Sequence, residues 1–215
     1  MSEINQEVKM EFKEGKRPII VEIGPAGLYG SGTPASNFSR RIKDSINDGA
    51  LYIGLDSKEE DLRKFMESRA WKYDIQQALV GDMAHLPLAD GSADEIWLLN
   101  VFSNLDIRPE IQADGTQTWR INMSSFYKEL SRVIKPKGEI IIGELGFPMG
   151  GIGAVDYLTD VDFEQFGLKK AVYRGENFVE GCKRLGIIER LREIIKENPF
   201  TKGVDPFFII LSKKL

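Results

Sequence analysis

The chain has 215 residues, enough for one domain with a real core, and 42% of them are hydrophobic, which is normal for a globular protein. The net charge of −4 comes from 29 basic and 33 acidic residues that are well mixed, so nothing indicates a nucleic-acid or membrane surface of one sign. The single cysteine, Cys182, excludes an internal disulfide framework and a Cys-rich metal site, and the polar N-terminus without a secretory signal predicts a cytoplasmic protein.

Short β-branched runs alternate with helical patterns along the chain. Strands are predicted at residues 18–23, 51–55, 77–80, 95–101, 139–144 and 207–211. Helices are predicted at residues 37–46, 59–67, 123–134 and 178–185, and residues 187–195 fit either a strand or a helix. Such alternation predicts an α/β fold, a mostly parallel sheet with helices on both faces. We expect one domain over residues 18–215, preceded by a charged extension at residues 1–17.

Two stretches interrupt the alternation. Residues 103–122 are polar and join the fourth predicted strand to the next helix, and residues 143–153 follow the fifth strand. Both are predicted to be long loops. Ligands bind at the carboxyl ends of parallel strands in this architecture, so these loops are predicted to border a ligand site.

A glycine-rich turn follows the first predicted strand, in PIIVEIGPAG at residues 18–27. Glycines allow close backbone approach, and a helix N-terminus offers unpaired N–H groups, so such a turn can hold a nucleotide group. A connecting loop without a ligand remains an alternative. Glu22 lies two residues before Gly24, where a carboxylate needs a partner: a ligand ammonium or a network behind the turn. An exposed strand end or a structural salt bridge would also accommodate it.

Asp56 ends the second predicted strand, LYIGLD, about thirty residues beyond the first glycines. A carboxylate in this place can accept hydrogen bonds from both hydroxyls of a ribose. Asp56 or Ser57 can equally cap the following helix. The two interpretations do not exclude each other.

Asp82 and Met83 follow the third predicted strand, in the run GDMAHLPLADGSAD at residues 81–94. Asp82 could accept from the exocyclic amine of an adenine, and Met83 offers an apolar face and a backbone N–H to the ring. From composition alone, an ordinary loop fits the run as well.

This run resembles the Gly-Asp-Ala-x-x-Leu-Pro-Phe-x-Asp-x-Ser-Phe-Asp motif of the class I S-adenosylmethionine-dependent methyltransferases. The branch that it resembles most contains the ubiquinone/menaquinone-biosynthesis-type and small-molecule enzymes. A second match is LSRVIKPKG at residues 130–138, where the family has Leu-x-Arg-Val-Leu-Lys-Pro-Gly-Gly. The resemblance covers roughly residues 18–145. It implies a single-domain Rossmann-like fold with a mostly parallel seven-stranded sheet, S-adenosylmethionine as cofactor and methyl transfer as the activity.

The resemblance also implies roles for particular residues. Glu22 and Gly24 match the first motif, beside the methionine part of the cofactor, and Asp56 matches the ribose-binding acid. Asn100, at the end of the fourth strand, lies where the family contacts the amino-acid end of the cofactor and faces the acceptor. The predicted cofactor-binding set is Glu22, Gly24, Pro25, Ala26, Gly27, Asp56, Ser57, Asp82, Met83 and Asn100.

The first motif departs from the family pattern. Glycines usually stand two, four and six residues beyond the acid, whereas this chain has Gly24, Ala26 and Leu28, with Gly27 out of step. The departure leaves open which backbone N–H groups contact the cofactor and whether the turn supports turnover.

Methyl transfer from a sulfonium needs binding, orientation and exclusion of water, so no catalytic residue is assigned, and a general base is required only if the acceptor loses a proton. His85, the only histidine, is predicted to have a surface or capping role, and no metal site is predicted. The loop residues considered as reaching or lining an acceptor pocket are Asp106, Trp119, Glu144, Phe147, Met149 and Tyr157.

The predicted partner is a small-molecule acceptor, with no nucleic acid or membrane expected and the oligomeric state open. Two alternatives remain. One is a non-catalytic S-adenosylmethionine- or nucleotide-binding protein on the same fold. The other is an NAD(P)-dependent oxidoreductase, because Gly24, Gly27 and Gly30 loosely imitate a dinucleotide fingerprint.

Overall fold

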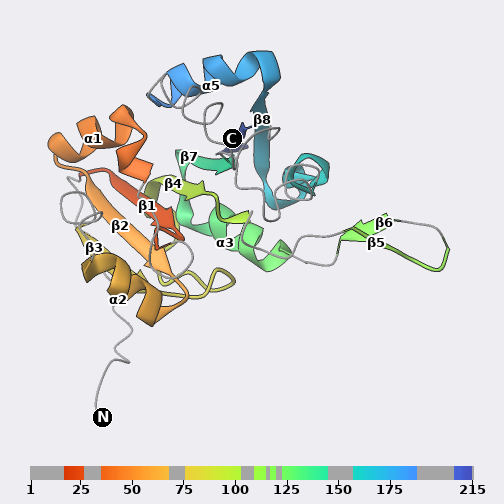
Figure 1. Ribbon diagram of the computed structural model, residues 1–215, viewed down its shortest axis with the longest axis horizontal. Helices are drawn as coiled ribbons and strands as arrows, with labels where there is room; N and C mark the ends of the chain where they lie inside the picture. Colours follow the sequence, from red (N-terminus) through yellow and green to blue (C-terminus); the bar gives the residue numbers. More distant parts are fainter. Residues whose placement is uncertain are drawn as a thin grey trace, which may run out of the picture.

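The computed structural model describes a single α/β domain over residues 17–26, 35–67, 76–102, 109–114, 117–119, 123–144, 157–187 and 206–214. Seven strands form one sheet (Figure 1). They are β1 (Ile19–Ile23), β2 (Leu51–Asp56), β3 (Gln77–Val80), β4 (Ala93–Leu99), β7 (Ile134–Glu144), β8 (Leu168–Arg174) and β9 (Phe207–Lys213). Their order across the sheet is β3-β2-β1-β4-β7-β9-β8, and β9 runs antiparallel to both neighbours while the other pairs are parallel. The predicted fold class is confirmed.

Helices cover both faces of the sheet. One face carries α1 (Arg40–Asn47), α2 (Glu59–Glu67) and α5 (Phe178–Arg184). The other face carries α3 (Ser124–Val133) and the 3₁₀ turn η4 (Phe163–Phe166). Successive residues of β4 alternate between the two layers, with Ile96 and Leu98 in one and Trp97 in the other. No helix among the described residues is long and apolar enough to span a membrane.

The start of α1 differs from the prediction. The helix begins at Arg40, because Ser39 is its N-cap and accepts a hydrogen bond from the Ile42 N–H at 3.3 Å. The residues before it form a separate 3₁₀ turn, η2 (Ala35–Asn37). At the other end Asp48 is the C-cap and Gly49 has φ +94°, so the helix ends at Asn47, one residue beyond the predicted end.

The predicted loop at residues 103–122 contains a β-hairpin. Its strands β5 (Pro109–Ile111) and β6 (Gln117–Trp119) pair antiparallel and form a separate two-stranded sheet. The hairpin projects from the body of the molecule in Figure 1, and Ile111 is 76% exposed on it. A polar loop was predicted because three-residue strands are too short to show a clear alternation in sequence.

Other differences concern single elements. The edge strand β8 was not predicted, and β4 ends at Leu99, two residues earlier than expected. β7 begins at Ile134, earlier than the predicted start at residue 139, and it ends at Glu144 as predicted, so residues 143 and 144 of the predicted loop belong to this strand. The described residues do not extend to 145–156 or 188–205, which hold the rest of that loop and most of the ambiguous segment.

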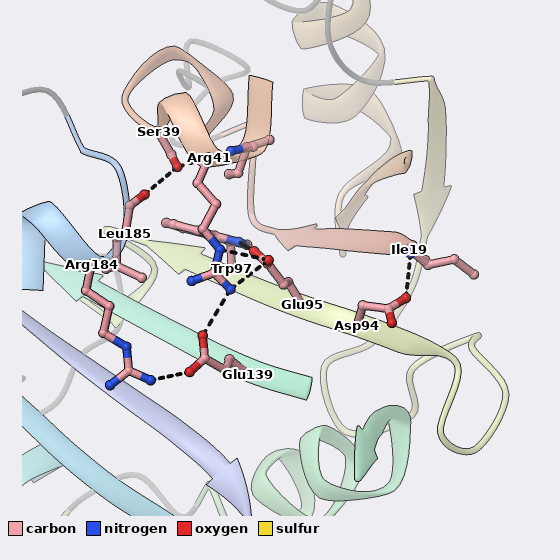
Figure 2. Close-up of polar contacts among 10 residues, drawn as sticks. Ile19, Ser39, Arg41, Asp94, Glu95, Trp97, Glu139, Arg184 and Leu185 are labelled. Atoms are coloured by element: carbon pink, nitrogen blue, oxygen red, sulfur yellow. Dashed lines mark hydrogen bonds and ion pairs between the residues drawn. The ribbon is translucent and has the colours of Figure 1, made fainter. Parts of the chain in front are cut away.

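A polar network fastens α1 and α5 to the sheet near the amino ends of the parallel strands (Figure 2). Arg41 of α1 donates to Glu95 of β4 at 2.7 Å and to Glu139 of β7 at 3.0 Å. Arg184 of α5 also pairs with Glu139. The Ser39 hydroxyl donates to the Leu185 carbonyl at 2.8 Å, which joins the start of α1 to the end of α5.

Candidate cofactor site at the carboxyl edge of the sheet

The glycine turn, of which residues 24–26 are described, lies between the ends of β2 and β4. The Gly24 N–H donates to the Leu55 carbonyl at 2.8 Å. Gly24 has φ +74°, and a Cβ at this position would lie 3.0 Å from Val101 Cγ2. A glycine is needed here because the backbone conformation is left-handed and Val101 packs against it. The turn therefore brings three strand ends together.

Asp56 lies directly beside this turn. Its carboxylate accepts hydrogen bonds from the backbone N–H groups of Ala26, Ser57 and Lys58, the last at 3.2 Å. Burial raises the pKa of Asp56, and these backbone hydrogen bonds only partly offset the rise. The bond to Lys58 forms a turn just before α2, which begins at Glu59, so it satisfies no N–H group of the helix itself and the capping interpretation stays a prediction. Because the carboxylate remains partly exposed, ribose binding stays a prediction that is compatible with this turn.

Asp82 lies at the next strand end. The Gly81 N–H donates to the Asp56 carbonyl at 2.9 Å, which links the two aspartate segments. The Asp82 side chain is 69% exposed, and its Oδ1 accepts from the Ala84 N–H at 2.9 Å. This bond lowers the pKa of Asp82, so the group is a charged acceptor at the surface. Met83 packs partly buried against the core beneath it.

Glu22 faces inward. It is 2% exposed, and its Oε1 accepts from the Ala35 N–H at 2.8 Å. The Tyr52 hydroxyl donates to its Oε2. Burial, followed by the charge of Glu22, raises the pKa of Tyr52 well above its ordinary value. The sequence left several possible partners for Glu22, and these contacts support a hydrogen-bond network behind the glycine turn.

Tyr52 is a residue that the sequence reasoning missed. Tyr52 pairs with Ile20 in the register of β1 and β2, so Tyr52 and Glu22 are diagonal neighbours on one face of the sheet. The sequence feature that could have indicated this contact was a tyrosine within the apolar second strand, beside a first strand that carries an acid. Strand pairing had to be known before the two could be connected.

Asn100 follows β4 and has φ +55°, the single positive value among the described non-glycine residues. Such a conformation is uncommon for residues other than glycine, although asparagine adopts it more readily than most, and it occurs in turns and at functional sites. Its N–H donates to the Gly143 carbonyl at 2.8 Å, and two residues later the Phe102 N–H donates to Glu144 Oε1 at 2.8 Å. Asn100 is thus at the carboxyl edge, between the glycine turn and the end of β7.

The remaining candidates fall into two groups. His85 is 86% exposed and lies 3.6 Å from Asp82 Oδ2, in agreement with a surface role, and Cys182 is buried on α5. Tyr157 is buried, and burial raises its pKa. Outside the described residues or side chains lie Gly27, Asp106, Trp119, Phe147 and Met149.

The residues present fit an adenosine cofactor. The ends of β2 and β3 carry two carboxylates on adjacent segments, and neither is shut away from solvent. The glycine turn contacts the first of them through the Ala26 N–H and leaves no room for a side chain at Gly24. Hydrogen-bond acceptors for a ribose and an adenine amine therefore stand at neighbouring strand ends, next to a closely approaching backbone.

Comparison with known proteins adds a family match. A family model described as a methyltransferase domain matches residues 29–142. A malonyl-[acyl-carrier protein] O-methyltransferase from Methylovorus sp. (strain MP688) is 25% identical over 148 residues, which are 66% of this chain and 44% of that protein. The chain thus spans less than half the length of this curated relative.

Solved structures share the fold. A methyltransferase from Aquifex aeolicus that depends on S-adenosylmethionine superposes with a TM-score of 0.52 at 15% identity, covering 91% of this chain and 82% of the other. A protein from Pyrococcus horikoshii gives a TM-score of 0.51 at 14% identity, covering 93% of this chain and 83% of the other. At such identities the likeness concerns the architecture alone.

Proposed function

We propose that this chain, which belongs to the family of class I S-adenosylmethionine-dependent methyltransferases, transfers a methyl group to a small-molecule acceptor. The chain is a methyltransferase, and S-adenosylmethionine is its methyl donor. The observation that carries the proposal is the carboxyl edge itself. There the glycine turn, Asp56, Asp82 and Asn100 meet at the ends of four adjacent strands.

Each part of this edge has a distinct role in the proposal. S-adenosylmethionine supplies an electrophilic methyl group on a sulfonium sulfur. Asp56 accepts hydrogen bonds from the ribose hydroxyls, and Asp82 accepts from the adenine amine. Gly24 to Ala26 allow close backbone approach to the methionine part, and Glu22, two residues before Gly24, holds the start of η2 by accepting from the Ala35 N–H.

The acceptor side lies toward β7, beyond Asn100. Buried apolar and aromatic residues back this side, among them Phe102, Met123 and Tyr157. The well-mixed charges of the chain give no basic stretch interleaved with aromatic residues, which supports a small molecule over a nucleic acid. The name of the Methylovorus relative describes O-methylation of a malonyl group on a carrier protein, which supports including acyl compounds among the acceptors.

The oxidoreductase alternative fits the sheet poorly. A dinucleotide-binding sheet has six parallel strands in the order 3-2-1-4-5-6, built from two mononucleotide halves. Here β9 runs antiparallel between β7 and β8, so the second half is not of that type. This strand order supports methyl transfer over hydride transfer.

The test is a pair of measurements on the full chain. Calorimetric titration with S-adenosylhomocysteine should give saturable binding, whereas NAD⁺ and NADP⁺ should give none. Turnover is then followed as S-adenosylhomocysteine release over a panel of small carboxylic acids, phenols and amines, with malonyl-carrier protein as a macromolecular comparison. Release with a free small molecule is the expected result. Cofactor binding without turnover on any acceptor would favour the non-catalytic alternative, and turnover on the carrier-bound acyl group alone would overturn the free small-molecule acceptor.

A further inference from the structure

Glu144 is a buried acid that methyl transfer, as described above, does not use. It is the last residue of β7 and is only 4% exposed. Burying a carboxylate is costly unless it accepts hydrogen bonds. Its Oε1 accepts from the backbone N–H of Phe102 at 2.8 Å, in a fully buried contact across 42 positions of sequence. The end of β7 is thereby tied to the segment that follows β4.

That segment is the turn of Asn100, Val101 and Phe102. Leu99 pairs with Gly143 in the parallel register of β4 and β7, and the Asn100 N–H donates to the Gly143 carbonyl at 2.8 Å. After this point Asn100 adopts φ +55°, which costs energy for a residue with a side chain. A strained turn persists only when its surroundings hold it, and the Glu144–Phe102 bond is a contact that does so.

The same turn contacts the glycine turn. Val101 Cγ2 would lie 3.0 Å from a Cβ placed on Gly24. Val101 stands between Asn100 and Phe102, so any shift of the Phe102 amide moves the side chain that packs against Gly24. A continuous set of contacts therefore runs from Glu144 through Phe102 and Val101 to the glycine turn.

We propose that Glu144 is a positioning residue for methyl transfer, whose carboxylate holds the Asn100–Phe102 turn against the glycine turn through the Phe102 amide. The inference rests on the proposed function and deepens it. In this role Glu144 needs the reach and an acceptor oxygen, but it needs no proton to exchange with the acceptor. A general base at the same position would need an ionisable group.

The experiment compares two substitutions that separate reach from charge. E144Q keeps the length and a carbonyl oxygen that can accept from Phe102, while E144D keeps the charge and shortens the side chain. E144A removes both, and E180A, at an exposed position of α5, is the matched control. The readouts are amide hydrogen exchange at Phe102, the dissociation constant of S-adenosylhomocysteine, and kcat against pH.

The expected result is that E144Q and E180A stay within about twofold of the wild type in all readouts. E144A and E144D should exchange Phe102 faster and bind S-adenosylhomocysteine about tenfold more weakly, the scale of one lost buried hydrogen bond. If E144A does not fold, the comparison of E144Q with E144D carries the test. The proposal is overturned if E144D resembles the wild type more closely than E144Q does. It is also overturned if E144Q loses kcat and the pH dependence of kcat while the Phe102 amide stays protected from exchange, because that result would identify Glu144 as a general base.

Failure of this inference differs from failure of the proposed function. A wild-type chain that turns over no small acceptor would contradict the function, yet Phe102 exchange and cofactor affinity would still report on Glu144. Conversely, active E144A and E144D proteins with unchanged Phe102 exchange would remove the positioning role and leave the methyltransferase proposal intact.

Discussion

At the scale of single residues, two aspartates at adjacent strand ends have opposite surroundings. Asp56 is partly buried, so its pKa is raised by burial even though three backbone N–H groups bind it. Asp82 is exposed, and its pKa is lowered by the Ala84 N–H. The same residue type therefore offers a partly desolvated acceptor at one position and a solvated one at the other.

Replacement of each aspartate by alanine tests its place in the site. D56A and D82A are each expected to weaken binding of S-adenosylmethionine by about 1–3 kcal/mol, because a cofactor donor loses its acceptor. Calorimetric titration measures the change, with D90A as a control, since Asp90 is an exposed acid paired with Arg132 in another turn. Unchanged affinity for D82A would remove Asp82 from the site. A loss of thermal stability without a loss of affinity in D56A would leave Asp56 as a cap only.

The raised pKa of Asp56 predicts a pH dependence of binding. Only the charged carboxylate accepts hydrogen bonds from two hydroxyls. Because the pKa of Asp56 lies above the ordinary value of 3.8, Asp56 takes up its proton at a higher pH than an ordinary aspartate does. Affinity for S-adenosylhomocysteine should therefore fall on acidification before an ordinary aspartate is protonated. Titrations across the acidic range measure this fall, and D56N should bind more weakly at neutral pH without a comparable further fall. Parallel curves for D56N and the wild type would contradict the assignment.

Tyr52 is expected to support the glycine turn through Glu22. Y52F removes a donor from a buried carboxylate and should lower the free energy of unfolding by about 1–3 kcal/mol. Urea denaturation measures this change, and calorimetry should show weaker cofactor binding because Glu22 also holds Ala35. Y173F is the control, since that hydroxyl accepts from Arg184 at an exposed position. Equal effects of the two substitutions would mean that the Glu22–Tyr52 contact stabilises the fold no more than the exposed hydrogen bond of Tyr173 does.

At the scale of elements, α1 and α5 are joined to the sheet by charged groups as well as by apolar packing. Glu139 is shared by Arg41 and Arg184, one from each helix (Figure 2). Burial acts to raise the pKa of Glu139, but hydrogen bonds and charge from the two arginines outweigh it, and the pKa is lowered. The network lies at the amino ends of the parallel strands, at the opposite edge from the candidate site.

E139Q should destabilise the fold without weakening the cofactor site. The expected loss in the free energy of unfolding is about 1–2 kcal/mol at neutral pH, because two charge-assisted hydrogen bonds are weakened. Since the folded-state pKa lies below the ordinary 4.5, this contribution is present above that value and is lost as the pH falls through the folded pKa. The difference between E139Q and the wild type in urea denaturation should therefore shrink below pH 4.5. If the difference in unfolding free energy were the same at all pH values, the loss in E139Q would come from packing and not from the charge of Glu139.

Elements with strong local signals were predicted closely, and those that depend on distant neighbours were not. The predicted bounds of α2 and β3 agree with the structure, because an acidic first turn and an apolar run bounded by polar residues are local features. β8 was missed because LKKAVYR has a weak alternation, and lysines on edge strands protect against unwanted pairing.

In the candidate site, too, features with a local sequence signal were predicted and contacts between distant residues were not. Motif spacing placed Gly24, Asp56 and Asp82 on neighbouring strand ends, and the structure joins these ends by backbone hydrogen bonds from Gly24 to Leu55 and from Gly81 to Asp56. It did not reveal the partners of Glu22, since the Tyr52 contact depends on strand register. Similarly, the bond from Phe102 to Glu144 joins residues far apart in sequence, and no local pattern encodes it.

At the scale of the whole molecule, the sheet separates two tasks. Its carboxyl edge holds the strained Asn100, the positive-φ Gly24 and partly exposed carboxylates, which are features of binding rather than of stability. Its amino edge holds the arginine–glutamate network and the hydrogen bond between the ends of α1 and α5. Substitutions at one edge should therefore leave the other largely unaffected, because the sites share no partners.

The position of β9 has a consequence for biosynthesis. A ribosome completes β7 and β8 well before residues 207–213 are made, yet in the sheet that the structure describes β9 lies between these two strands and pairs with both. Until then the nascent polypeptide carries bare edges on both strands, which are the kind of surface that chaperones shield. Translation must therefore run through nearly all of this sequence before the sheet can close, and a stalled or prematurely ended product would retain the glycine turn and its aspartates in a molecule prone to aggregate.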